Sequence, residues 1–204
     1  MNYNFKPKKT PDEFGWHDRG YLPHFDAGQL PQFVTFRLAD SMPRELLDKW
    51  RVEAKTDAEF RKRIEGYLDS GYGECWLGDP RIGKMVEDAL LFHNGSKYWL
   101  KAWVIMPNHG HVLLTPLENI HLPDIMHSIK SYTANEANKI IGRSGQFWQI
   151  ESFDRYIRNL KHFVSTARYI ENNPVKAGLC AKPEDWPFSS ARFRATGAQA
   201  SCLP

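Results

Sequence analysis

The segment between Tyr98 and Pro116 constrains the fold more than any other part of the chain. It contains two runs rich in apolar and β-forming residues, 99–106 and 109–114, which are separated only by Pro107 and Asn108. Proline followed by asparagine is a turn signal, and strands joined by so short a connection pair in opposite directions. We therefore predict an antiparallel hairpin over this segment.

The other periodic segments predict further strands and several helices. Residues 32–38 alternate polar with apolar side chains and are rich in β-formers, and another strand is expected within 146–157. Helical patterns cover 41–69 (as two helices broken near Thr56), 84–93, 122–141 and 161–173. We expect Pro174 to stop the last helix, because the residue before proline is pushed out of the α region. This order of elements predicts an α+β fold, an antiparallel sheet flanked by helices.

Length and composition exclude several classes of protein. Of the 204 residues, 42% are hydrophobic and 25% charged, which is typical of a globular chain. The longest apolar run near the middle, 102–106, is far short of the roughly 20 residues of a membrane span. The N-terminus lacks the apolar region of a secretory signal, and three widely spaced cysteines form no CxxC pair. We therefore expect a cytoplasmic protein without a membrane partner, either a monomer or a homodimer.

Positive charge is concentrated in one part of the chain. The net charge is only +3, but residues 130–182 contain nine lysines and arginines against four acidic residues, which leaves +5 in that stretch. This asymmetry suits a phosphate-binding surface, and a solvated helix face is the alternative explanation.

Two histidines in the second run of the hairpin are candidate metal ligands. Residues i and i+2 of a strand point to the same face with Cα atoms about 6.5–7 Å apart, so His109 and His111 can converge on one divalent cation. Gly110 would then point the other way, into the core. The alternative is that His109 is an ordinary polar residue of the turn at Pro107–Gly110.

A second candidate pair lies in the predicted helix 161–173. Tyr169 and Asn173 are i and i+4, so they lie on one helical face, and an asparagine oxygen suits Mg²⁺ or Mn²⁺. The alternative is that Asn173 is a helix stop and Tyr169 a half-buried core residue. Tyr156 and Tyr132 compete as candidate nucleophiles; Tyr156 lies in the expected strand, and Tyr132 is expected in the core. Only Tyr169 has a metal-capable residue at i+4.

Three stretches of the chain form an ordered set of motifs, MPNHGHVLL (106–114), FWQIESFDRYIRN (147–159) and RYIENNPVKAGL (168–179). They resemble the signature motifs of REP-associated tyrosine transposases, the domesticated branch of the single-tyrosine HUH (IS200-like) transposase superfamily. GWHDRGYLPHFD, QFVTFRLADS and PEDWPFSS also fit, so the resemblance extends from about residue 15 to residue 194.

The resemblance implies a fold, an activity and a set of site residues. The implied fold is the ferredoxin- or RRM-like HUH endonuclease fold, with a catalytic domain over 31–180. An irregular N-terminal arm (1–30) would precede it, and a C-terminal tail (181–204) would pack on or beside it. His109, His111 and Asn173 would bind a divalent metal, Mg²⁺ or Mn²⁺. Tyr169 would attack single-stranded DNA of a REP-type hairpin and form a 5′-phosphotyrosine.

One position departs from the family pattern. The residue between the paired histidines is usually bulky and hydrophobic, whereas here it is Gly110. We expect this change to loosen the strand and to lower metal affinity.

Phosphate contacts are expected from the basic side chains near Tyr169, with Phe147 and Trp148 as possible base-stacking surfaces. A surface or packing role is the alternative for each of them. These basic residues are Arg155, Arg158, Lys161, Arg168 and Lys176. Two other functions stay open at this point: a metal-dependent hydrolase that uses the histidine pair, and a non-catalytic nucleic-acid-binding α+β module.

Overall fold

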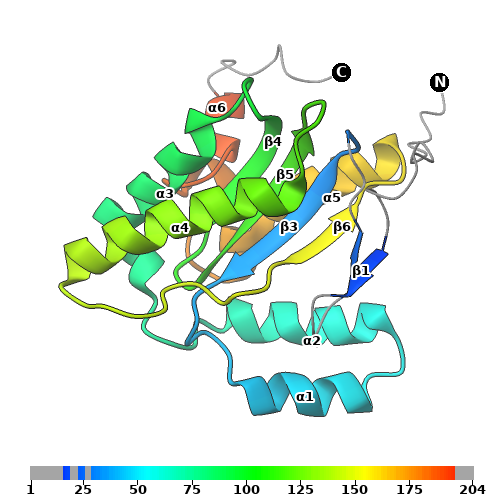
Figure 1. Ribbon diagram of the computed structural model, residues 1–204, viewed down its shortest axis with the longest axis horizontal. Coiled ribbons are helices and arrows are strands. Elements are labelled where there is room, and N and C mark those ends of the chain that lie inside the picture. The colour runs from blue at the N-terminus through cyan, green and yellow to red at the C-terminus, as the bar shows by residue number, and fades with distance from the viewer. Residues whose placement is uncertain (1–15, 19–22, 26–28, 196–204) are drawn as a thin grey trace.

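The computed structural model describes residues 16–18, 23–25 and 29–195 (Figure 1). Its centre is a four-stranded antiparallel sheet in the order β4-β5-β3-β6. The strands are β3 (Gln32–Arg37), β4 (Tyr98–Ile105), β5 (His109–Pro116) and β6 (Phe153–Tyr156). β4 and β5 form the predicted hairpin, closed by a hydrogen bond from the Met106 N–H to the His109 carbonyl (2.8 Å).

Helices cover both faces of this sheet, which confirms the predicted α+β class. α3 (Pro80–Phe92) and α4 (Leu122–Ile141) pack on the face that carries Val34, Phe36 and Val112. α5 (Leu160–Lys176) packs on the opposite face, against Phe33 and Leu113. In Figure 1, α4 crosses in front of the sheet and α5 lies behind it.

Two further helices lie beyond the lower end of the sheet in Figure 1. They are α1 (Arg44–Glu53) and α2 (Asp57–Asp69), and the break between them is where the sequence predicts it. Thr56 caps α2, since its hydroxyl accepts a hydrogen bond from the Glu59 N–H (3.1 Å). α1 buries none of its residues and α2 only Phe60 and Leu68, so this helical pair is held by little apolar surface.

The predicted end of α5 at Pro174 is wrong, because the helix continues to Lys176. A proline in the last turn removes only one intrahelical hydrogen bond. Asn173 and Pro174 are both buried, and the Ala177 N–H still donates to the Asn173 carbonyl (2.9 Å). Packing therefore outweighs the local preference of the residue before proline.

The two ends of the chain contain short elements. Within the segment expected to be an irregular arm, β1 (Trp16–Asp18) pairs with β2 (Pro23–Phe25), beside β6. After α5 come the 3₁₀ turn η2 (Pro183–Asp185) and α6 (Ala191–Ala195). This last segment lies along β4: the Trp186 indole donates to the Ile105 carbonyl (2.8 Å), and the Ile105 N–H donates to the Phe188 carbonyl (2.9 Å).

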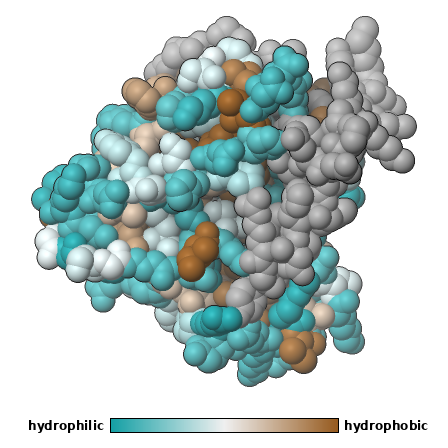
Figure 2. All heavy atoms as spheres, viewed as in Figure 1, coloured by the Kyte–Doolittle hydropathy of each residue, from teal (hydrophilic) through white to brown (hydrophobic). Residues whose placement is uncertain are grey.

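The outer surface is mainly polar on the face shown in Figure 2, where apolar side chains form small separate patches. Within the described residues, no helix is both long and apolar enough to cross a membrane.

Candidate active site

The two histidines lie at the start of β5, a central strand of the sheet, on the face covered by α5. Their Nε2 atoms are 3.1 Å apart, and both side chains are buried. The i, i+2 spacing in β5 places them on one face, as the sequence predicts. Two imidazole nitrogens so close together can both bind one cation.

Burial keeps both imidazoles neutral. It lowers the pKa of His109 to about 3, and Lys176 adds a smaller effect in the same direction. The pKa of His111 is lowered well below its usual value, first by burial and then by His109, Lys176 and Arg155. Neutral imidazole is the charge state that binds metals, so neither histidine has to lose a net proton to bind a cation at physiological pH.

Tyr169 lies against the histidine pair. Its ring centroid is 5.6 Å from that of His111 and 6.0 Å from that of Phe33, both in edge contacts. The hydroxyl is buried and makes no hydrogen bond with the described residues. Burial raises the pKa of this phenol above its usual value, and the nearby carboxylates of Glu65 and Asp69 raise it further. Without a cation or substrate, Tyr169 is therefore protonated.

The two competing tyrosines lie elsewhere. Tyr156 pairs with Gln32 in β6, one residue out of phase with Arg155 and Phe33, and so points to the opposite face of the sheet from His111. Tyr132 is 55% exposed on α4, so the expectation of a core role is wrong. Among the tyrosines that the structure describes, Tyr169 is the one whose ring contacts a histidine of the pair.

Asn173 lies one turn after Tyr169 and is fully buried. Neither its Oδ1 nor its Nδ2 has a hydrogen-bond partner among the described residues. A buried amide without partners is costly, so a ligand that binds here would satisfy it. The described residues contain no cluster of three His, Cys, Asp or Glu side chains that could hold a metal. The donor set of two imidazoles and this amide oxygen nevertheless fits a divalent cation.

The space beside Gly110 is filled by a residue of the neighbouring strand. Phe36 is paired with Gly110 across β3 and β5, and its ring also contacts Trp148, at 5.1 Å between centroids. A Cβ atom at position 110 would lie 2.5 Å from Phe36 Cζ. The bulky group between the histidines is thus supplied by the neighbouring strand.

The expected DNA-binding residues fall into two groups. Arg158, Lys161 and Arg168 are exposed. Arg155 instead stacks on Phe33, with its Cζ 4.9 Å from the ring centroid, and Lys176 is paired with Asp69 (2.5 Å).

The acidic residues of α2 that face these cations were not identified from the sequence. Asp69 pairs with Lys176, and Glu65 lies beside Tyr169 and Arg155. Burial raises the pKa of the Glu65 carboxyl, while Arg155 opposes that change. Glu65 and Asp69 are i and i+4 on α2, so the sequence places them on one face of the helix. This spacing does not say which residues of other elements that face contacts.

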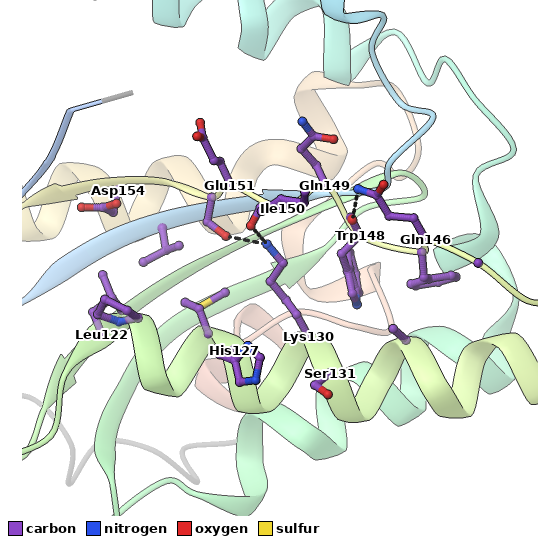
Figure 3. A pocket seen from close by; sticks show the side chains of 17 residues that line it. Leu122, His127, Lys130, Ser131, Gln146, Trp148, Gln149, Ile150, Glu151 and Asp154 are labelled. Atoms are coloured by element: carbon purple, nitrogen blue, oxygen red, sulfur yellow. Dashed lines mark hydrogen bonds between the residues drawn. The ribbon is translucent and has the colours of Figure 1, made fainter. Parts of the chain in front are cut away.

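The two aromatic residues expected to stack on bases are buried. Phe147 and Trp148 lie in the core under α4, and the Trp148 indole donates to the Thr133 hydroxyl (2.8 Å). Beside them, α4 and residues 145–154 form a groove of about 540 Å³ (Figure 3). Lys130 points into this groove and donates to the Ile150 carbonyl (2.8 Å). The groove is on the α4 side of the sheet and is separate from the histidine pair.

Two polar residues that contact the histidines were also missed. The Asn108 Oδ1 is 2.7 Å from His109 Nδ1, and the Thr35 hydroxyl is 2.8 Å from His111 Nδ1. Asn108 directly precedes the pair and could have been identified from the sequence. Thr35 comes from β3, and only the register of the sheet places it opposite His111.

Comparison with known proteins gives concordant results. Residues 90–173 match the family described as "Transposase IS200 like". A curated relative, the REP-associated tyrosine transposase of Escherichia coli (strain K12), is 31% identical over 93 residues, or 45% of this chain. The match spans 53% of that relative, about half of its length.

A solved structure of a REP-associated tyrosine transposase bound to a REP hairpin has the same fold. The match covers 92% of this chain and 90% of that chain, with a TM-score of 0.54 and 21% sequence identity. The family match contains His109, His111, Tyr169 and Asn173, whereas β3 and α2 lie outside it.

Proposed function

We propose, on the premise that residues 90–173 are similar to the IS200-like transposases, that this chain is a REP-associated tyrosine transposase. It would act as a single-stranded DNA endonuclease and strand transferase on REP-type hairpin DNA. The observation that carries the proposal is the meeting of Tyr169 with the His109–His111 pair, since these residues are about 60 positions apart in the sequence. The catalytic domain would cover residues 31–180.

A divalent metal, Mg²⁺ or Mn²⁺, would be held by the imidazoles of His109 and His111 and the amide oxygen of Asn173. Such an ion polarises a bound phosphate and stabilises the charge of the transition state. The unpaired amide of Asn173 and the two facing Nε2 atoms support this ligand set.

Tyr169 would be the nucleophile. Its oxygen would attack the phosphorus, forming a 5′-phosphotyrosine bond as the bond from phosphorus to the 3′ oxygen breaks. The phenol loses its proton and the departing 3′ oxygen gains one. The 3′-hydroxyl can later reverse the step, so strand transfer needs no external energy source.

The DNA backbone would run along the start of α5 toward Tyr169. Arg158, Lys161 and Arg168 are exposed and available for phosphate contacts. Arg155 and Lys176 flank the tyrosine itself, with the Lys176 Nζ 5.9 Å from the Tyr169 ring centroid. These two cations would contact the phosphate that is attacked.

The test is covalent capture of a labelled REP-type hairpin with a single-stranded flank, in the presence of Mn²⁺. We expect an SDS-resistant adduct with the wild-type chain and with Tyr156→Phe, and none with Tyr169→Phe. Tyr156 is a matched control because it points to the other face of the sheet. An adduct with Tyr169→Phe that disappears with Tyr156→Phe would contradict the assignment.

The same experiment separates the competing functions. Free cleavage products without an adduct would favour a hydrolase that uses the histidine pair. A mobility shift without cleavage would favour a non-catalytic nucleic-acid-binding module.

A further inference from the structure

We propose that Asn108 is a positioning residue that fixes His109 in its metal-binding tautomer, whereas Thr35 allows His111 to change tautomer when a metal binds. The inference rests on the metal site proposed above and concerns how the chain prepares that site before the ion arrives.

The orientation of the Asn108 amide is determined by its surroundings. Its Nδ2 lies 3.2 Å from the Leu68 carbonyl and 2.9 Å from the Tyr72 carbonyl, at the end of α2 and in the loop that follows. Both carbonyls can only accept, so the amide nitrogen must face them and donate. The Oδ1 atom is thereby turned toward His109.

This orientation determines which nitrogen of His109 carries the proton. Asn108 Oδ1 can only accept, and it lies 2.7 Å from His109 Nδ1. The Nδ1 atom of His109 must therefore be the protonated one. In a neutral imidazole this leaves the lone pair on Nε2, which points to His111 and to the proposed metal position.

His111 has no such fixed partner. Its Nε2 lies 3.1 Å from the His109 Nε2, and a hydrogen bond between the two needs a proton on His111, since His109 offers a lone pair there. The Nδ1 of metal-free His111 then accepts a hydrogen bond from the Thr35 hydroxyl (2.8 Å). A hydroxyl can donate or accept by rotating, which an amide held at both ends cannot do.

Metal binding would therefore move one proton within the site. When a cation takes the Nε2 position of His111, the proton leaves that nitrogen and Nδ1 becomes protonated. The Thr35 hydroxyl, which donated to Nδ1 before, then accepts a hydrogen bond from it. The number of protons on the pair is unchanged, and His109 keeps its tautomer throughout.

The first measurement is nitrogen-15 NMR of the histidine rings, which distinguishes the two tautomers directly. In the metal-free chain we expect His109 protonated on Nδ1 and His111 on Nε2. Zn²⁺ is a diamagnetic ion that imidazole binds well. After saturation with Zn²⁺, only His111 should change its tautomer. A proton on Nε2 of metal-free His109 would overturn the proposal, and so would a change of tautomer at His109 alone.

The second measurement is Mn²⁺ affinity by calorimetry in variants of Asn108. Asn108→Leu removes the acceptor for His109 and should weaken binding about 10- to 100-fold, the usual effect of losing a group that orients a metal-bound histidine. Asn108→Asp keeps an acceptor but places carboxylate charge against two carbonyls. It should lower the melting temperature as Leu does while retaining most of the Mn²⁺ affinity.

If Mn²⁺ affinity falls equally in both variants, Asn108 has only a structural role and the inference is wrong. None of these measurements requires DNA. A chain that shows the expected tautomers and Mn²⁺ affinities but forms no adduct would refute the proposed function and leave this inference standing.

Discussion

At the scale of single residues, Gly110 shows that one position can be understood only together with its partner on the next strand. A glycine between the two histidines removes a side chain from the core. Phe36 restores that volume from β3 and makes an edge contact with the Trp148 ring. The two positions are therefore expected to be energetically coupled.

Gly110→Val should destabilise the chain by about 1–3 kcal/mol, because the new side chain overlaps the Phe36 ring. Adding Phe36→Leu to Gly110→Val should recover part of that loss, although Phe36→Leu alone is destabilising. The midpoint of urea unfolding measures both effects. Gly66→Ala in α2 is the control, since nothing lies within 4 Å of a Cβ there; we expect it to stabilise by about 0.5–1 kcal/mol. Simple additivity of the two core changes would contradict the coupling.

At the scale of elements, α2 is the helix whose contacts with the candidate site could not be predicted from the sequence. It lies outside the matched segment 90–173 and buries little apolar surface. It nevertheless brings Glu65 and Asp69 to the cations beside Tyr169, where a DNA phosphate would bind. In the DNA-free chain, these carboxylates lie against Lys176 and Arg155, the cations that would otherwise be available to a phosphate.

Asp69→Asn should therefore increase affinity for single-stranded DNA, because Lys176 loses its competing partner. The Lys176 side chain is 55% exposed and that of Asp69 only 11%. With about 1 kcal/mol, the upper value for a surface ion pair, we expect a gain of about fivefold. The slope of log affinity against log salt should also steepen by about 0.7, the value for one added phosphate contact. Fluorescence anisotropy over a salt series measures both quantities.

Asp88→Asn is the matched control for this prediction. It removes the same charge from another surface ion pair, with Lys84 on α3, which packs on the face of the sheet opposite to α5 and Tyr169. If both variants raise DNA affinity equally, net charge explains the effect and α2 has no special part in it.

At the scale of the whole molecule, the segment after α5 is part of the folded unit. Arg192 pairs with Glu87 of α3 (2.5 Å), a carboxylate that also accepts from the Trp103 indole (2.9 Å). Arg194 pairs with Glu171 of α5 (2.5 Å). The C-terminal segment thus links helices that lie on opposite faces of the sheet.

Arg192→Met should lower the melting temperature by about 6–12 °C at neutral pH. The variant leaves Glu87 buried without its partner, which costs roughly 3 kcal/mol. Burial raises the pKa of Glu87, so protonation removes the unpaired charge as the pH falls, and the cost should shrink toward pH 5. Thermal unfolding at pH 5 and 7.5 measures this difference, with Arg192→Lys as the conservative control. An equal loss at both pH values would show that the charge of Glu87 is not its cause.

Much of the site could be predicted because its residues come in short-range pairs. The i, i+2 spacing of His109 and His111 and the i, i+4 spacing of Tyr169 and Asn173 each place two side chains on one face of one element. Local periodicity depends only on the geometry of a strand or a helix. The β4–β5 hairpin was predictable for the same reason.

The surroundings of these residues were decided by contacts between distant segments. Thr35 is 76 positions from His111 and Asp69 is 107 positions from Lys176, and nothing in local periodicity brings them together. The continuation of α5 through Pro174 was likewise decided by the burial of Asn173. The sequence by itself therefore determined which side chains are candidates for the site. Only the tertiary structure decided the hydrogen-bond partners of these side chains and which cations are already paired. The physical reason is that these contacts join distant segments, and the local geometry of a strand or helix does not favour one such contact over another.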